Sequence, residues 1–156
     1  MRVINKEELE VFDDDQYVWY ACYGSNINME RLMIYINGDC NEVFASQGGC
    51  SNKEEPLAYK LYVFDCPIYF AGESKIWTGG MAFLDYTSKG IAYGRIYKMQ
   101  MNQFKQIFEQ EKRTLLYDTI IYIEQIEGLP VLTFSAHKKL ECLNKPSDKY
   151  LDVIKR

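Results

Sequence analysis

The spacing of apolar residues predicts that the chain opens with a strand, a short loop and a helix. Residues 17–22 are a continuous aromatic and β-branched run, which is typical of a strand buried on both faces. Residues 23–26 have the composition of a turn. From Asn28 to Ile36, apolar residues recur at three- and four-residue spacing, which predicts a helix directly after that turn.

The rest of the chain is dominated by strand patterns. Short apolar and aromatic runs between turn residues predict strands at 57–64, 68–70, 77–84 and 91–99. A hairpin is predicted over 116–125 and 129–135, with its turn at Glu127-Gly128, and further helices at 100–112 and 148–155. Many strands with few helices predict an α+β domain built on a mixed, barrel-like β-sheet.

Two segments have no regular apolar pattern. Residues 1–16 are acidic and are predicted to be an N-terminal extension, so the domain is expected to span residues 17–156. Residues 37–56 are rich in glycine, asparagine and serine, which predicts a long loop. Loops of this length are usually functional or mobile.

Length and charge fit one ordinary globular domain. The chain has 156 residues, of which 47% are hydrophobic, and its formal net charge is −4. The acidic balance, without a basic stripe, argues against nucleic acid or a membrane surface as the main partner. No apolar run approaches the roughly 20 residues of a membrane-spanning helix, and the first residues lack a signal-peptide pattern. A homodimer is compatible with these properties.

The cysteines favour a reduced, cytoplasmic protein. Their number, five, is odd, and no CxxC pair is present. The single histidine, His137, precedes Cys142 by five residues, which is a poor start for a zinc site with four convergent ligands. The pattern therefore argues against a zinc site. A catalytic pair of Cys and His is a less favoured alternative.

Glu111 is the most informative residue for chemistry. The apolar face of helix 100–112 is defined by Met101, Phe104, Ile107 and Phe108. Glu111 continues this spacing, which predicts a buried carboxylate, whereas Glu109 is predicted to face solvent. Burial raises the pKa of a carboxyl group toward neutrality, which suits a general base. The alternative is a glutamate at a helix end that reaches water.

The loop at residues 23–26 is the second candidate. Gly24 would let a ligand approach the backbone, and the N–H groups at the start of a helix bind carboxylates or a developing oxyanion. The alternative is an ordinary capped turn, because Ser25, Asn26 and Asn28 are all suitable helix caps. As an isolated pattern, the loop is weak evidence.

Taken in order, the motifs resemble those of the gamma-glutamylcyclotransferase family. They are Tyr-Gly-Ser-Asn at 23–26, Trp-x-Gly-Gly-x-Ala at 77–82, Gly-x-x-Tyr at 94–97, Glu-Gln-Glu at 109–111 and Pro-Ser-x-x-Tyr at 146–150. The resemblance runs from about Tyr17 to the end of the sequence. It implies a gamma-glutamylcyclotransferase-like fold.

The resemblance also implies a function and a set of site residues. The family cyclises a gamma-glutamyl group of a small molecule to 5-oxoproline and releases an amino acid or amine, which implies that no metal or organic cofactor is needed. Glu111 would be the general acid/base, and the substrate would be bound by Tyr23, Gly24, Ser25, Asn26, Ile27 and Tyr117. Three alternatives stay open: a non-catalytic binding module on the same fold, a structural role for Glu111, and a cyclotransferase for a larger gamma-glutamyl-bearing acceptor.

Overall fold

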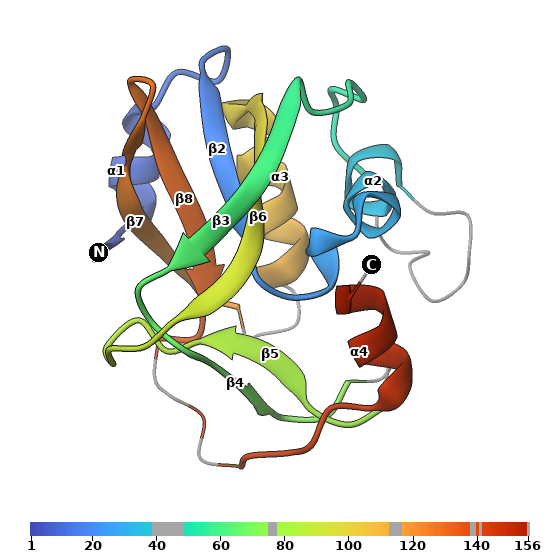
Figure 1. Ribbon diagram of the computed structural model, residues 1–156. Helices are drawn as coiled ribbons and strands as arrows, with labels where there is room; N and C mark the ends of the chain where they lie inside the picture. Colours follow the sequence, from blue (N-terminus) through green and yellow to red (C-terminus); the bar gives the residue numbers. More distant parts are fainter. Residues whose placement is uncertain (39–48, 75–77, 113–116, 138–139, 141, 156) are drawn as a thin grey trace.

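A curled, mixed sheet forms the centre of the molecule (Figure 1). The computed structural model describes residues 1–38, 49–74, 78–112, 117–137, 140 and 142–155. The six strands follow the order β1-β7-β8-β2-β6-β3. Their bounds are β1 Arg2–Ile4, β2 Tyr17–Cys22, β3 Ala58–Phe64, β6 Ala92–Gln100, β7 Thr119–Ile126 and β8 Leu129–Ser135. Neighbouring strands are antiparallel except for β2 and β8, which are parallel, so the predicted mixed sheet is confirmed.

The sheet curls strongly but stays open, with β1 and β3 as its edges. Side chains of β3 nevertheless reach the β7 region: Tyr62 donates a hydrogen bond to Glu124, and Lys60 Nζ lies 3.4 Å from a carboxylate oxygen of Glu127. The sheet is therefore barrel-like, as predicted, only in its curvature. Side chains connect β3 to the β7 region, and the two strands lack the backbone pairing that would close a barrel.

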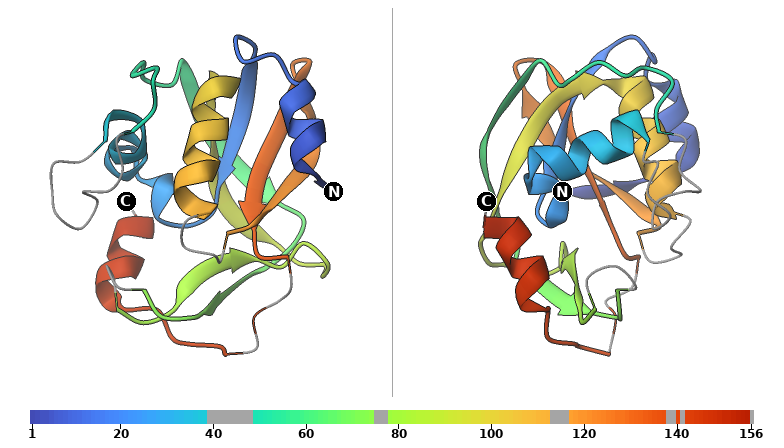
Figure 2. Two further views of the ribbon diagram at one scale, coloured as in Figure 1. Left: turned by 180° about the vertical axis from the view of Figure 1, so that it is seen from behind. Right: turned by 90° about the vertical axis from the view of Figure 1, so that its right-hand side faces the viewer.

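Three helices cover one face of this sheet (Figure 2). α3 (Met101–Lys112) runs along the sheet, with α1 (Lys6–Val11) on one side and α2 (Met29–Asn37) on the other. The predicted apolar face of α3 is confirmed. Its buried apolar residues are Met101, Phe104, Ile107 and Phe108, and Glu109 is exposed. Tyr20, Tyr97 and Phe134 of the sheet pack in the same apolar cluster as this helix.

A smaller unit packs against one end of the sheet. It consists of a two-stranded sheet, β4 (Ile68–Ala71) with β5 (Met81–Leu84), and the last helix, α4 (Asp148–Lys155). An added Cβ on Gly80 would lie 1.9 Å from the carbonyl oxygen of Asn144, so this glycine permits a close backbone contact. Trp77, the aromatic residue of the same motif, lies outside the described residues.

The first sixteen residues are part of the fold and not a separate extension. β1 pairs with β7, and Ile4 and Leu9 are buried in the main apolar cluster. Asn5 caps α1 through a reciprocal capping box with Glu8. Among the described residues, no helix is both long and apolar enough to span a membrane.

Candidate active site

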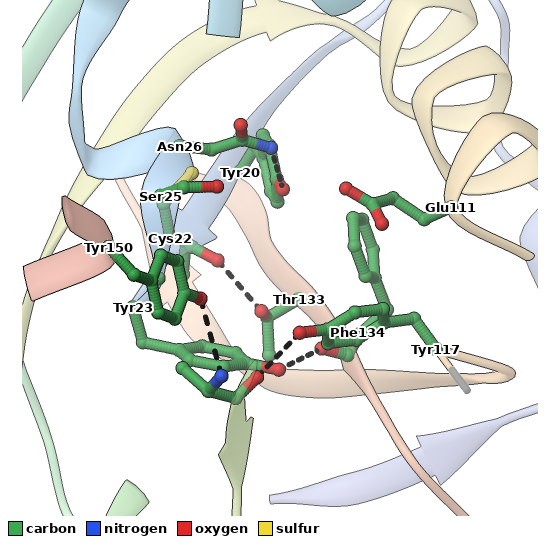
Figure 3. Close-up of a pocket in the computed structure, with 13 residues that line it drawn as sticks. Tyr20, Cys22, Tyr23, Ser25, Asn26, Glu111, Tyr117, Thr133, Phe134 and Tyr150 are labelled. Atoms are coloured by element: carbon green, nitrogen blue, oxygen red, sulfur yellow. Dashed lines mark hydrogen bonds between the residues drawn. The ribbon is translucent and has the colours of Figure 1, made fainter. Parts of the chain in front are cut away.

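A small pocket lies where the end of β2, the following turn, α3 and α4 meet (Figure 3). Its lining includes residues 20–26, Glu111, Tyr117, Thr133, Phe134 and Tyr150. The cavity volume is about 40 Å³. Because one water needs roughly 10–15 Å³ on the same scale, the enclosed part suits a small polar group.

The turn after β2 is free to line this pocket because none of its residues caps the next helix. Residues Ser25–Ile27 form a short 3₁₀ turn, η1. The side chain of Asn28 accepts hydrogen bonds from the N–H groups of Glu30 at 3.0 Å and Arg31 at 3.4 Å, so Asn28 is the cap of α2. Ser25 and Asn26 are therefore available to line the pocket.

Gly24 and Tyr150 bring the turn against α4. An added Cβ on Gly24 would lie 3.0 Å from the Tyr150 hydroxyl oxygen, so a side chain there would crowd this contact. The same oxygen accepts a hydrogen bond from the N–H of Ala82 at 3.2 Å, and another from the backbone of Ser25. Tyr150 thus ties the 23–26 loop to β5.

Glu111 is the charged residue of this pocket. Its exposed fraction is 9%, and its carboxylate comes from the last turns of α3 and points toward Tyr20 and Asn26 (Figure 3). Burial raises the pKa of Glu111 to about 7, although a hydrogen bond with Tyr35 and the charge of Arg31 oppose this shift. At this pKa the carboxyl group can both accept and return a proton near pH 7.

Two neutral tyrosines also line the pocket. The Tyr23 hydroxyl donates to the carbonyl oxygen of Phe134 at 2.7 Å, and the Tyr117 hydroxyl donates to that of Ala82 at 2.6 Å. The Tyr117 ring also stacks on Phe83, with ring centroids 4.8 Å apart. Burial raises the pKa of both hydroxyls well above the ordinary value, so both stay protonated.

Asn26 carries an unsatisfied buried oxygen. Its Nδ2 donates to the Tyr20 hydroxyl at 3.1 Å, whereas its Oδ1 has no hydrogen-bond partner among the described residues. A buried acceptor without a partner costs about 1–3 kcal/mol.

The structure brings together six of the seven residues that the sequence predicts for the site. They are Tyr23, Gly24, Ser25, Asn26, Glu111 and Tyr117. Ile27 is the exception. It ends the 3₁₀ turn, its carbonyl oxygen accepts a hydrogen bond from Tyr97 at 2.8 Å, and its side chain packs against the main apolar cluster instead of the pocket.

Sequence reasoning did not assign a role to several residues around the pocket. Tyr150 stands in a motif that the resemblance already included, which is a signal for it. Tyr35 follows the capped start of α2 by seven residues, so two helical turns place it on the same face as Asn28. Tyr20 lies on a strand whose residues are all aromatic or apolar, and nothing in that pattern distinguishes it. Within the described ranges, no group of three His, Cys, Asp or Glu residues could hold a metal ion.

The comparisons with known proteins rest on structure. No protein-family model and no curated protein matches the sequence. A solved structure of a gamma-glutamyl cyclotransferase superposes with a TM-score of 0.61 at 18% identity, covering 89% of this chain and 76% of that one. An uncharacterised human protein gives 0.60 at 19% identity, covering 88% and 76% respectively.

A third similar structure is YkqA from Bacillus subtilis, with a TM-score of 0.59 at 17% identity. The alignment covers 90% of this chain but 48% of YkqA. These similarities show that the chain has the gamma-glutamylcyclotransferase-like fold that its motifs predicted. At such low identity they establish the fold alone.

Proposed function

We propose that this protein is a gamma-glutamyl cyclotransferase that uses Glu111 as its general acid/base. The observation that carries the proposal is the placement of a buried carboxyl group, with a pKa of about 7, opposite the Tyr23–Asn26 loop in one small pocket. A raised carboxyl pKa inside a cleft is typical of a catalytic group. The fold agrees with this assignment.

The polar groups of the pocket match the head of a gamma-glutamyl compound. The Glu111 carboxylate lines the pocket and would accept a hydrogen bond from the α-ammonium group. The backbone N–H groups of the 23–26 loop, apart from that of Ser25, which donates to Tyr150, would bind the α-carboxylate or the developing oxyanion. Because the reaction is intramolecular, folding the glutamyl chain into an attacking geometry supplies part of the rate.

The proposed chemistry is an acyl transfer within one molecule. Glu111 takes a proton from the α-ammonium, and the freed amine attacks the γ-carbonyl carbon and forms the ring C–N bond. The protonated Glu111 then gives its proton to the leaving nitrogen as the bond from that nitrogen to the γ-carbon breaks. Glu111 then takes the second proton from the ring nitrogen and passes it to the released amine, so that 5-oxoproline and an ammonium product form without water.

The first experiment is 5-oxoproline release from a panel of gamma-glutamyl amino acids and gamma-glutamylamines. We expect release by the parent protein and a loss of about 10²–10⁴-fold in Glu111→Gln, because acid/base catalysis is worth that much. Glu109→Gln is the matched control, since Glu109 lies on the exposed face of the same helix. It should keep the parent rate.

The same panel separates this proposal from its alternatives. Binding of 5-oxoproline to the parent protein without any turnover would favour a non-catalytic binding module. Release only from a gamma-glutamyl group on a larger acceptor would keep the chemistry and change the substrate. A rate in Glu111→Gln close to that of the parent would contradict the acid/base role.

A further inference from the structure

The edge strand β3 carries an exposed apolar stripe. Tyr59, Leu61 and Val63 alternate along one face of this strand, and Leu61 is 84% exposed. Tyr93 of β6 lies directly opposite Val63 and is 74% exposed. The stripe lies outside the pocket described above, because β3 is an edge strand of the sheet and contributes no residue to the pocket lining.

The helices leave this stripe uncovered. Tyr97 of β6 points to the same side of the sheet and is buried beneath the helices, whereas its neighbour on β3, Tyr59, is exposed. Arg95, opposite Leu61 on this face, stacks its guanidinium on the Tyr59 ring. Among the described strands, β6 is the only one that pairs with β3, so the backbone groups on the outer side of β3 have no strand beside them. An apolar edge strand is a template for pairing with another strand.

We propose that β3 pairs with β3 of a second copy of this chain, antiparallel and centred on Leu61. Leu61 is the middle residue of Ala58–Phe64, so this register pairs the whole strand with its copy. Leu61 lies opposite Leu61, and Tyr59 opposite Val63 of the second copy. The stripe of each copy thereby packs beside the stripe of the other, as an interface with twofold symmetry requires.

Charge selects this register over its neighbour. Lys60 is the charged residue of Ala58–Phe64, and a register centred on it would place two lysines directly opposite each other, which is destabilising. Centred on Leu61, each Lys60 instead faces Tyr62 of the second copy. Tyr62 is hydrogen-bonded to Glu124, so each lysine approaches the acidic group of the other copy.

Sedimentation of the parent chain and two variants tests this interface. The parent should be a dimer, and Leu61→Lys should be a monomer with an unchanged circular dichroism spectrum, because two lysines would meet at the symmetry axis. Val11→Lys is the matched control. Val11 is also 84% exposed but lies at the end of α1, so this variant should remain a dimer. A monomeric parent, or a dimeric Leu61→Lys, would overturn the proposal.

A crosslink tests the register. Directly opposite residues of an antiparallel pair have Cα atoms about 4.5–5.5 Å apart, which a disulfide can span. In a background with Cys142→Ser, which removes the exposed thiol among the described cysteines, and Cys40→Ser, Leu61→Cys should form a covalent dimer on mild oxidation. Val11→Cys in the same background should not. Absence of the Leu61→Cys crosslink would contradict pairing centred on this residue.

Discussion

At the scale of single residues, the pocket combines one buried carboxyl group with protonated tyrosines. The spacing of α3 was sufficient to predict the burial of Glu111, because a helix of fixed period places it on the face of Phe104 and Phe108. The partners of Glu111 could not be predicted in this way. Tyr35 and Tyr150 come from other helices, and only the packing of these helices brings them near.

The raised pKa of Glu111 predicts that the unfolding free energy depends on pH. The folded state holds this proton to about pH 7, whereas an ordinary glutamate loses it near 4.5. The stabilisation that the protonated Glu111 side chain adds to the unfolding free energy is therefore fully present below pH 4.5 and is lost as the pH rises through 7. Relative to Glu111→Gln, the parent should lose up to about 3 kcal/mol of unfolding free energy between pH 4.5 and 8. Urea denaturation of both proteins at two pH values measures this difference, and a difference independent of pH would be inconsistent with a buried, ionising carboxyl group.

Tyr150→Phe tests the anchor of the 23–26 loop. The variant removes the acceptor of the Ala82 N–H, so we expect a loss of about 1–3 kcal/mol in unfolding free energy. A displaced loop would also lower kcat/KM for 5-oxoproline release by about tenfold or more, because small misplacements of binding groups are costly. Tyr93→Phe, which alters an exposed tyrosine, should change neither quantity. Parent-like activity in Tyr150→Phe would contradict the role of Tyr150 in positioning the 23–26 loop.

At the scale of elements, the strand–turn–helix order at residues 17–37 followed from the sequence, but its capping residue did not. Ser25, Asn26 and Asn28 are chemically equivalent candidates. The structure selects Asn28 because the other two candidates, Ser25 and Asn26, belong to the 3₁₀ turn. Because Asn28 is the cap, Ser25 and Asn26 can line the pocket, whereas the side chain of Ile27 packs against the main apolar cluster.

Asn28→Ala should lower the unfolding free energy by about 1 kcal/mol, because it removes the acceptor for two N–H groups of α2. Thermal denaturation would detect this as a decrease of roughly 2–4 °C in Tm. Asn28→Asp keeps a capping oxygen and should retain most of the stability. Equal stability of the alanine and aspartate variants would show that the cap contributes little.

At the scale of the whole molecule, the strand order depends on contacts that local patterns do not encode. The strands themselves were largely predictable, yet β1 pairs with β7 and β2 pairs with β8 across long stretches of sequence. An acidic segment with few apolar residues looks like an extension. Two of its apolar residues, Ile4 and Leu9, nevertheless complete the core.

Leu9→Ala tests whether the first residues belong to the cooperative unit. Leu9 is buried in the main cluster, so we expect a loss of about 2–5 kcal/mol in unfolding free energy. Val11→Ala, at an exposed position of the same helix, should have little effect. Urea denaturation measures both, and an unchanged midpoint in Leu9→Ala would mean that the segment unfolds separately.

The proposed role of Glu111 is tested most directly by the pH dependence of kcat/KM for 5-oxoproline release from a gamma-glutamyl amino acid or amine. If Glu111 is the base, kcat/KM should rise with pH to a plateau, with a midpoint near 7, as its carboxyl group ionises. In Glu111→Gln this step should disappear together with most of the activity. A profile in Glu111→Gln with the same midpoint and a similar rate would contradict the central claim that Glu111 moves the proton.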